Sequence, residues 1–185
     1  MKQLILLLIS TTLSSLSLAQ NSPDPEFPGR PYILLQNNIL ESIERSDGNI
    51  DVKMPGIGYS GSETYYSAYN PKSSTRLSKN LIPKFIIKLD GANTDPKDVL
   101  LLSKGISKKD RRQFLRFKMT MGGKSIDVSS SFVKLEFKKV KDGIYEILLP
   151  ESIEIGEYAF MQIISSNDFA AYSTTIKLSC FGIDL

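Results

Sequence analysis

Apolar and polar residues alternate along most of this chain in short runs that are typical of β-strands. In FVKLEFKKV (132 to 140) the apolar residues lean to one face, namely Val133, Leu135, Phe137 and Val140. Because successive side chains of a strand point to opposite faces, one face of this strand should be buried and the other solvated. No stretch keeps a helical apolar period for three turns, and only SKKDRRQF (107 to 114) could form a turn or two of helix.

Turn residues separate these runs at the spacing of an all-β domain. Further strands are expected at 32 to 36, 39 to 46, 84 to 89, 98 to 103, 114 to 119, 144 to 149, 157 to 164 and 173 to 181. The first two should form a hairpin, because Asn37 and Asn38 between them tolerate the positive φ of a tight turn.

A glycine and a tyrosine near the end of the chain suggest how the sheets are joined. Gly156 stands two residues before Tyr158 at the start of a late strand. In Greek-key sandwiches a tyrosine at this place bonds through its hydroxyl to a backbone group a few residues upstream and fixes the corner between two sheets. The pattern therefore predicts an immunoglobulin-like Greek-key β-sandwich of about 8 to 9 strands with little helix, in which Tyr158 and Gly156 are structural.

The first residues, 1 to 19, are typical of a secretory signal peptide. They contain Lys2, an apolar run from Leu4 to Ile9, and small residues at Ser17 and Ala19, after which cleavage is expected. An uncleaved anchor is the alternative. Residues 20 to 31 hold four prolines and predict an extended linker, which leaves 32 to 185 as the β-sandwich domain. The mature protein should be periplasmic or secreted, with no transmembrane segment.

Composition excludes several chemistries. The chain has 23 Lys and Arg against 20 Asp and Glu, so removing Lys2 with the signal peptide changes the net charge from +3 to +2. It has no histidine and one cysteine, Cys180, which excludes histidine-based catalytic triads, histidine metal sites and an internal disulfide. No catalytic residue, no metal ligand set and no cofactor is therefore predicted.

The loop DGANTDPKD (90 to 98) offers hard oxygen ligands that would suit calcium. They are Asp90, Asn93, Asp95 and Asp98. The spacing does not match a calcium loop with ligands at alternate positions, and Asp-Pro with Gly is ordinary turn composition. A solvated turn is the preferred interpretation.

A cluster of cations between residues 104 and 118 is a candidate basic surface for an anionic glycan, a lipid headgroup or nucleic acid. Its central members are Lys108, Lys109, Arg111, Arg112 and Arg116. A solvated strand edge that is protected from aggregation by its lysines is the alternative. No aromatic-interleaved motif accompanies the cluster, so nucleic acid is not expected as a partner.

The stretch PGIGYSGSETYYSAY (55 to 69) is the strongest candidate for ligand binding. It places four of the eight tyrosines on a Gly and Ser background, namely Tyr59, Tyr65, Tyr66 and Tyr69. Recognition loops use this mixture, because tyrosine brings contact area at low entropy cost. The alternative is that ETYYSAY is a strand whose tyrosines are half-buried on a sheet.

Several blocks resemble an uncharacterised family of secreted bacterial immunoglobulin-like β-sandwich proteins over roughly residues 31 to 184. The blocks are YILLQNNILESIE, SSTRL, PKFIIKL, DVLLLSK, KKDRRQF, GEYAF and CFGID. The resemblance implies the fold and the exported location, and no activity.

These observations predict an exported, non-enzymatic binding or cell-envelope module whose partner is a protein or glycan of the envelope. One alternative is a carboxylate-dependent hydrolase directed at glycans, which needs acids that converge in a cleft with raised pKa values. Another is a structural subunit that pairs through an exposed edge strand.

Overall fold

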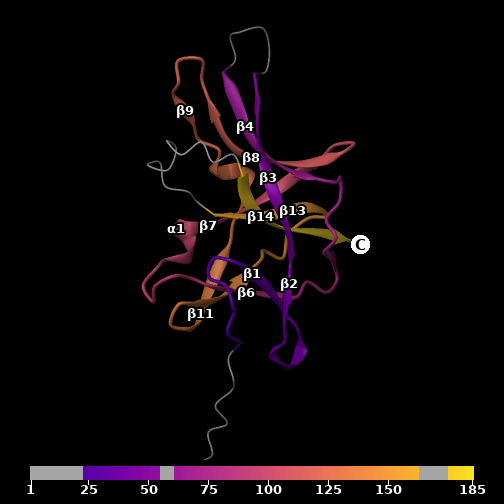
Figure 1. Ribbon diagram of the computed structural model, residues 1–185, viewed down its shortest axis with the longest axis vertical. Coiled ribbons are helices and arrows are strands. Elements are labelled where there is room, and N and C mark those ends of the chain that lie inside the picture. The colour runs from indigo at the N-terminus through magenta and orange to yellow at the C-terminus, as the bar shows by residue number, and fades with distance from the viewer. Residues whose placement is uncertain (1–22, 55–60, 163–174) are drawn as a thin grey trace, which may run out of the picture.

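The computed structural model describes residues 23–54, 61–162 and 175–185, and it confirms that the domain is all-β (Figure 1). One sheet has five strands, in the spatial order β11 (Glu136–Lys141), β12 (Ile144–Leu148), β6 (Lys84–Lys88), β1 (Pro31–Leu34) and β2 (Leu40–Ser42). The second runs β10 (Phe132–Val133), β7 (Leu100–Ser107), β13 (Gly156–Gln162), β14 (Thr175–Asp184), β3 (Glu44–Lys53), β4 (Ser62–Tyr69), β8 (Arg111–Met119) and β9 (Ser125–Ile126). Strand β5 (Arg76–Ser78) pairs in parallel with β14, and the helical turns are η1 (Gln36–Asn38), α1 (Pro96–Val99) and η2 (Ser129–Ser131).

The second sheet closes on itself, because β7 pairs with β13 along one edge and with β8 along the other. Six strands, β7, β13, β14, β3, β4 and β8, thus form a closed barrel. Gly105 permits the closure: a Cβ there would lie 2.6 Å from a ring carbon of Phe114, its partner across the β7–β8 pair. Since a sandwich needs two open sheets, the immunoglobulin-like arrangement is not confirmed.

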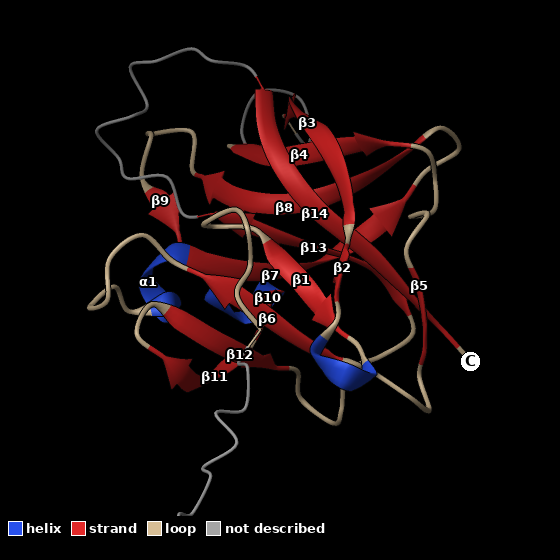
Figure 2. Ribbon diagram, turned by 60° about the horizontal axis from the view of Figure 1, so that its bottom comes forward, coloured by secondary structure: helices blue, strands red, loops and turns tan. Residues whose placement is uncertain are grey.

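The five-stranded sheet packs against one side of the barrel, where β13 and β14 contribute side chains to the core between them (Figure 2). Tyr158 and Phe160 belong to the core between the sheet and the barrel, whereas Ala159 and Met161 belong to the barrel interior. The ring centroid of Phe85, in the five-stranded sheet, lies 5.4 Å from that of Phe160, and the two rings meet edge to face. Both faces of β13 are therefore buried, which explains why GEYAFMQ is almost continuously apolar.

The N-terminal segment lies on the outer face of the five-stranded sheet. Asp24 binds Lys88 at 2.9 Å and Lys141 at 3.2 Å, the Gly29 amide donates to the Lys88 carbonyl at 2.7 Å, and Pro25 is buried. A small cluster of buried residues occupies this face, namely Tyr32, Ile86 and Ile144. The segment from Pro23 onward therefore contacts the sheet, and residues 1 to 22, with the predicted signal peptide, lie outside the described residues.

Of the local structures expected from the sequence, one is confirmed and two differ from the expectation. The hairpin of β1 and β2 is confirmed, with Asn37 and Asn38 at φ 64° and 61°. The expected strand 39 to 46 is instead divided at buried Ile43, because β2 belongs to the five-stranded sheet and β3 to the barrel. The helical turn expected at 107 to 114 is wrong: Ser107 ends β7 and Arg111 begins β8, and across the short turn between them the Lys108 amide donates to the Arg111 carbonyl at 2.7 Å.

The strand expected at 132 to 140 is divided into β10 and β11. Leu135 is buried in the main core with Val133 and Phe137 packed against it, as the alternation predicts. Val140 is 39% exposed, which differs from the expectation. It is an even position, whereas the buried residues of this segment are at odd positions, so it lies on the other face, at a register shift between Lys139 and Lys141.

Tyr158 bonds backward to the chain that precedes its strand. Its hydroxyl donates to the carbonyl of Glu154, four residues upstream, at 2.8 Å. Its ring stacks on that of Phe181, with 5.5 Å between the ring centroids. Gly156, which lies between Glu154 and Tyr158 in the chain, has a φ of 152°, a conformation that other residues rarely adopt. This is the hydrogen bond that the corner interpretation requires.

We expect Tyr158→Phe to lower the free energy of unfolding by about 1 to 3 kcal/mol, because the Glu154 carbonyl loses its donor while the ring stack remains. Tyr145→Phe is the matched control, since the Tyr145 hydroxyl makes a longer bond of 3.3 Å to the Thr94 carbonyl in a less buried place. Urea unfolding of both variants checks the expectation. Equal, negligible losses would show that the Tyr158 hydroxyl does not hold the corner.

Candidate binding site at the end of the barrel

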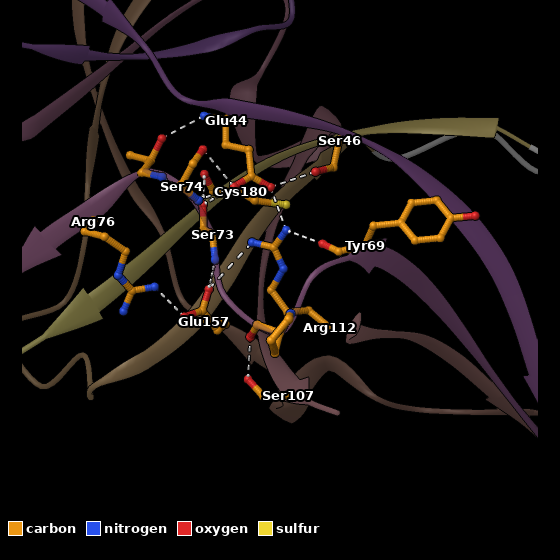
Figure 3. Close-up of polar contacts among 12 residues, drawn as sticks. Glu44, Ser46, Tyr69, Ser73, Ser74, Arg76, Ser107, Arg112, Glu157 and Cys180 are labelled. Carbon is orange, nitrogen blue, oxygen red and sulfur yellow. Dashed lines mark hydrogen bonds and ion pairs between the residues drawn. The ribbon is translucent and has the colours of Figure 1, made fainter. Parts of the chain in front are cut away.

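A buried arginine occupies one end of the barrel interior (Figure 3). Arg112 of β8 is 0% exposed and shares the inward parity of Phe114. Its Nη2 lies 2.6 Å from Oε1 of Glu44 on β3, and its Nη1 lies 3.6 Å from Oε2 of Glu157 on β13. Nη2 also donates to the Tyr69 carbonyl at 2.9 Å. One guanidinium therefore ties together three barrel strands and the end of β4.

The two carboxylates also hold the loop that joins β4 to β5 (70 to 75). The Ser73 amide donates to Glu157 Oε2 at 2.8 Å, and the Ser73 hydroxyl donates to Glu44 Oε2 at 2.8 Å. Ser74 donates to the same oxygen of Glu44 through its amide and its hydroxyl. The loop is thus fixed by charge-assisted hydrogen bonds, which are stronger than those between neutral groups.

A second set of contacts fixes this loop to the β7–β8 turn. The Asn70 amide donates to the Asp110 carbonyl at 2.9 Å, and the Ser107 hydroxyl donates to the Pro71 carbonyl at 3.1 Å. Asn70 has a φ of 66°, which asparagine tolerates better than most residues. Two segments that are distant in sequence therefore form one rigid end of the barrel.

The charged groups at this end of the barrel are suited to fixing the loop and not to transferring a proton. Burial opposes ionisation of Glu44, but hydrogen bonds from Arg112, Ser46, Ser73 and Ser74 together lower its pKa to about 2. Burial raises the pKa of the neighbouring Cys180 thiol to about 12, so it is not a ready nucleophile. A glycosidase needs a carboxylic acid with a raised pKa, and Glu44 is the opposite case.

An open hollow of about 540 Å³ lies beside the fixed loop. Its walls are Glu44, Ser46, Asn70, Pro71, Lys72, Ser73 and Ser74. Tyr69 precedes Asn70 of this wall in the chain and is 70% exposed, with its ring directed away from the ion network (Figure 3). We call the hollow together with Tyr69, Lys72, Lys108 and Lys109 the barrel-end surface.

The expected face of four tyrosines is not formed. Tyr65 and Tyr66 lie in β4 and are only 7% and 6% exposed. Because neighbouring strand residues point to opposite faces, Tyr66 points into the barrel, and Tyr65 points outward, where other side chains cover it. The Tyr65 hydroxyl donates to Glu63 at 2.6 Å beneath the ammonium of Lys53. Tyr59 lies outside the described residues, so Tyr69 is the one exposed member of the set among the residues that the structure describes.

The basic cluster is also divided by the fold. Arg112 is inside the barrel, and half-buried Arg116 donates to the Tyr66 hydroxyl at 3.2 Å. Arg111 is bound to Asp110 at 3.0 Å and lies 3.5 Å from Asp51. Lys108 and Lys109 remain exposed at the β7–β8 turn, where Lys72 from the other segment joins them.

Sequence reasoning missed the carboxylates of the site. Glu44 lies 68 positions from Arg112, and Glu157 lies 84 positions from Ser73. No local pattern reports such a distance. The one available signal was that Arg112 shares the parity of an apolar residue, Phe114, within a strand.

The acidic loop at 90 to 98 is occupied by local bonds. Asp95 accepts from the Lys97 amide at 2.9 Å and caps α1, and the Thr94 hydroxyl donates to the Asp90 carbonyl at 2.6 Å. Within residues 23–54, 61–162 and 175–185, no three acidic or thiol side chains gather as metal ligands would. In the same ranges no helix has the length and hydropathy to cross a membrane.

Comparisons with protein families, with curated proteins and with solved structures found no match to this chain. The resemblance to secreted bacterial immunoglobulin-like proteins therefore stays a prediction.

We expect Arg112→Met to lower the free energy of unfolding by about 3 to 5 kcal/mol, because it leaves the half-buried Glu44 without its counter-charge and leaves the buried Glu157 with Arg76 alone. Lys177→Met is the control: it breaks an ion pair with Asp47 whose side chains are 53% and 57% exposed, which should cost about 1 kcal/mol or less. Denaturant unfolding measures both. A loss for Arg112→Met no larger than that of the control would mean that the network contributes little to stability.

Proposed function

We propose that the protein is an exported, non-enzymatic module of the cell envelope that binds a glycan through the barrel-end surface. The observation that carries the proposal is the fixed β4–β5 loop, which the Arg112, Glu44 and Glu157 network holds from below. A loop fixed before binding loses little conformational entropy when a ligand arrives. Export rests on the predicted signal peptide alone.

The chemistry of the surface suits a sugar chain. Tyr69 offers an exposed ring on which a sugar face can stack, and the hollow beside it is lined by hydroxyl, amide and ammonium groups. Sugars need such convergent donors and acceptors, since their hydroxyls must exchange water for protein partners. An open hollow accommodates an internal segment of a polymer, whereas an enclosed pocket would accept only an end.

The two rival functions have less support. A hydrolase would need a carboxylic acid poised to donate a proton, and Glu44 at the hollow is held ionised. The edge strands of the five-stranded sheet are β11 and the three-residue β2. β11 carries Lys138, Lys139 and Lys141 and a register shift, and β2 is very short, which are features that keep edges unpaired. An immunoglobulin-like ancestry for the fold is a further proposal, which the Tyr158 to Glu154 hydrogen bond supports and the closed barrel opposes.

We expect Tyr69→Ala to weaken glycan binding by roughly tenfold, the equivalent of one lost stacking contact of about 1.4 kcal/mol. Binding would be measured by co-sedimentation with peptidoglycan sacculi and by affinity electrophoresis in gels that contain soluble polysaccharides. Melting temperature should not change, because the ring is 70% exposed.

Leu81→Ala, at a residue 81% exposed outside the barrel-end surface, is the matched control and should bind like the natural chain. Tyr69→Phe should retain binding if the ring acts by stacking. The proposal fails if no polymer of the panel binds, or if Tyr69→Ala binds as well as the natural chain.

A further inference from the structure

We infer that the glycan is anionic, a polysaccharide whose repeating units carry carboxylate or phosphate groups that bind Lys72, Lys108 and Lys109. This inference rests on the proposed function and adds the ligand class. It rests on a difference between the two kinds of charge at the barrel-end surface: the acids are paired within the protein, whereas the ammonium groups of the lysines are not.

The acids of this surface are neutralised by bonds within the protein. Asp110 accepts from Arg111 through both carboxylate oxygens, at 3.1 and 3.0 Å. Glu44, at the wall of the hollow, is bound to Arg112 and to the serines of the loop. Both carboxylates therefore already have a cationic partner within the protein.

The side chains of the three lysines, in contrast, are exposed, and their ammonium groups make no hydrogen bond or ion pair to any described residue. The charge of Lys72 contributes to lowering the pKa of Asp184, but hydrogen bonds from Arg76 are the main cause of that shift. Unpaired ammonium groups on a surface whose acids are already engaged produce a local positive potential, and this attracts anions.

The fold brings these lysines together from two distant segments. Lys72 follows Pro71, whose carbonyl accepts from Ser107, and Lys108 and Lys109 lie between Ser107 and Asp110, whose carbonyl accepts from Asn70. Both bonds hold the β4–β5 loop against the β7–β8 turn. The positions of the charges are therefore set before a ligand binds, which reduces the entropy lost on binding.

Lysine charge and an open surface select a polymer over a single small anion. An ammonium group is a point charge on a flexible stem, so it suits anionic groups repeated along a chain better than one fixed bidentate contact. A lipid surface is disfavoured because the described residues contain no amphipathic helix to lie in it. Single-stranded nucleic acid needs several stacking aromatics, and Tyr69 is the single exposed aromatic of this surface.

The test uses the mature chain and two matched pairs of polymers. Polygalacturonate is compared with its fully methyl-esterified form, and phosphorylated dextran with plain dextran, by isothermal titration calorimetry. We expect at least one charged polymer to bind roughly tenfold or more tighter than its neutral partner, and this preference to fall as salt rises from about 50 to about 300 mM, because salt screens exposed charges.

Two triple variants that remove the same charge locate the site. Lys72→Gln, Lys108→Gln and Lys109→Gln together should abolish the preference for the charged polymer. Lys97→Gln, Lys124→Gln and Lys138→Gln, at three exposed lysines whose ammonium groups also lack a partner among the described residues, should leave it unchanged. Both variants should melt at the natural temperature.

The outcomes separate this inference from the function on which it rests. If Tyr69→Ala loses binding while charged and neutral polymers bind the natural chain equally, the glycan function stands and the anionic class is wrong. Equal losses in the two triple variants would also overturn the inference, since total charge would then be the cause. Capture by vesicles of anionic lipid, with no binding of any polysaccharide, would overturn both proposals.

Discussion

The structure depends on one buried cation and its two counter-charges. Closing six strands into a barrel excludes bulk water from the end where Arg112 lies, so its guanidinium must find protein partners. Glu44 and Glu157 supply them from β3 and β13, the strands on either side of β14. The same carboxylates then hold Ser73, which makes the shape of an external loop a consequence of an internal ion pair.

Closure also divides the interior into two cores that share a wall. Because β13 and β14 are buried on both faces, Tyr158 and Phe181 can serve the core against the five-stranded sheet while Ala159 and Leu178 fill the barrel. The binding end of the barrel is therefore supported by two independent sets of packed side chains. Such support is what a preorganised surface needs, since its own loops contribute few apolar contacts.

The parts of the fold that follow local rules could be predicted, and the rest could not. Alternation identified most strands, and the two asparagines identified the first hairpin, because strand parity and positive φ are written in adjacent residues. The division at Ile43 and the closure of β7 onto β8 depend on which sheet each segment joins, which no local pattern encodes. At the site, composition treated Tyr65, Tyr66, Tyr69 and Arg112 alike as surface residues. Of these four only Tyr69 is exposed, because composition does not say which side chains become covered.

The central claim is that the buried ion network fixes the β4–β5 loop. Hydrogen–deuterium exchange of the natural chain and of Arg112→Met tests it most directly, because the Ser73 and Ser74 amides donate to Glu157 and Glu44. The account predicts that amides at 70 to 75 lose protection in the variant, while those of β6 and β12 in the five-stranded sheet keep theirs. Unchanged protection of the loop, or an equal loss in all these strands, would contradict it.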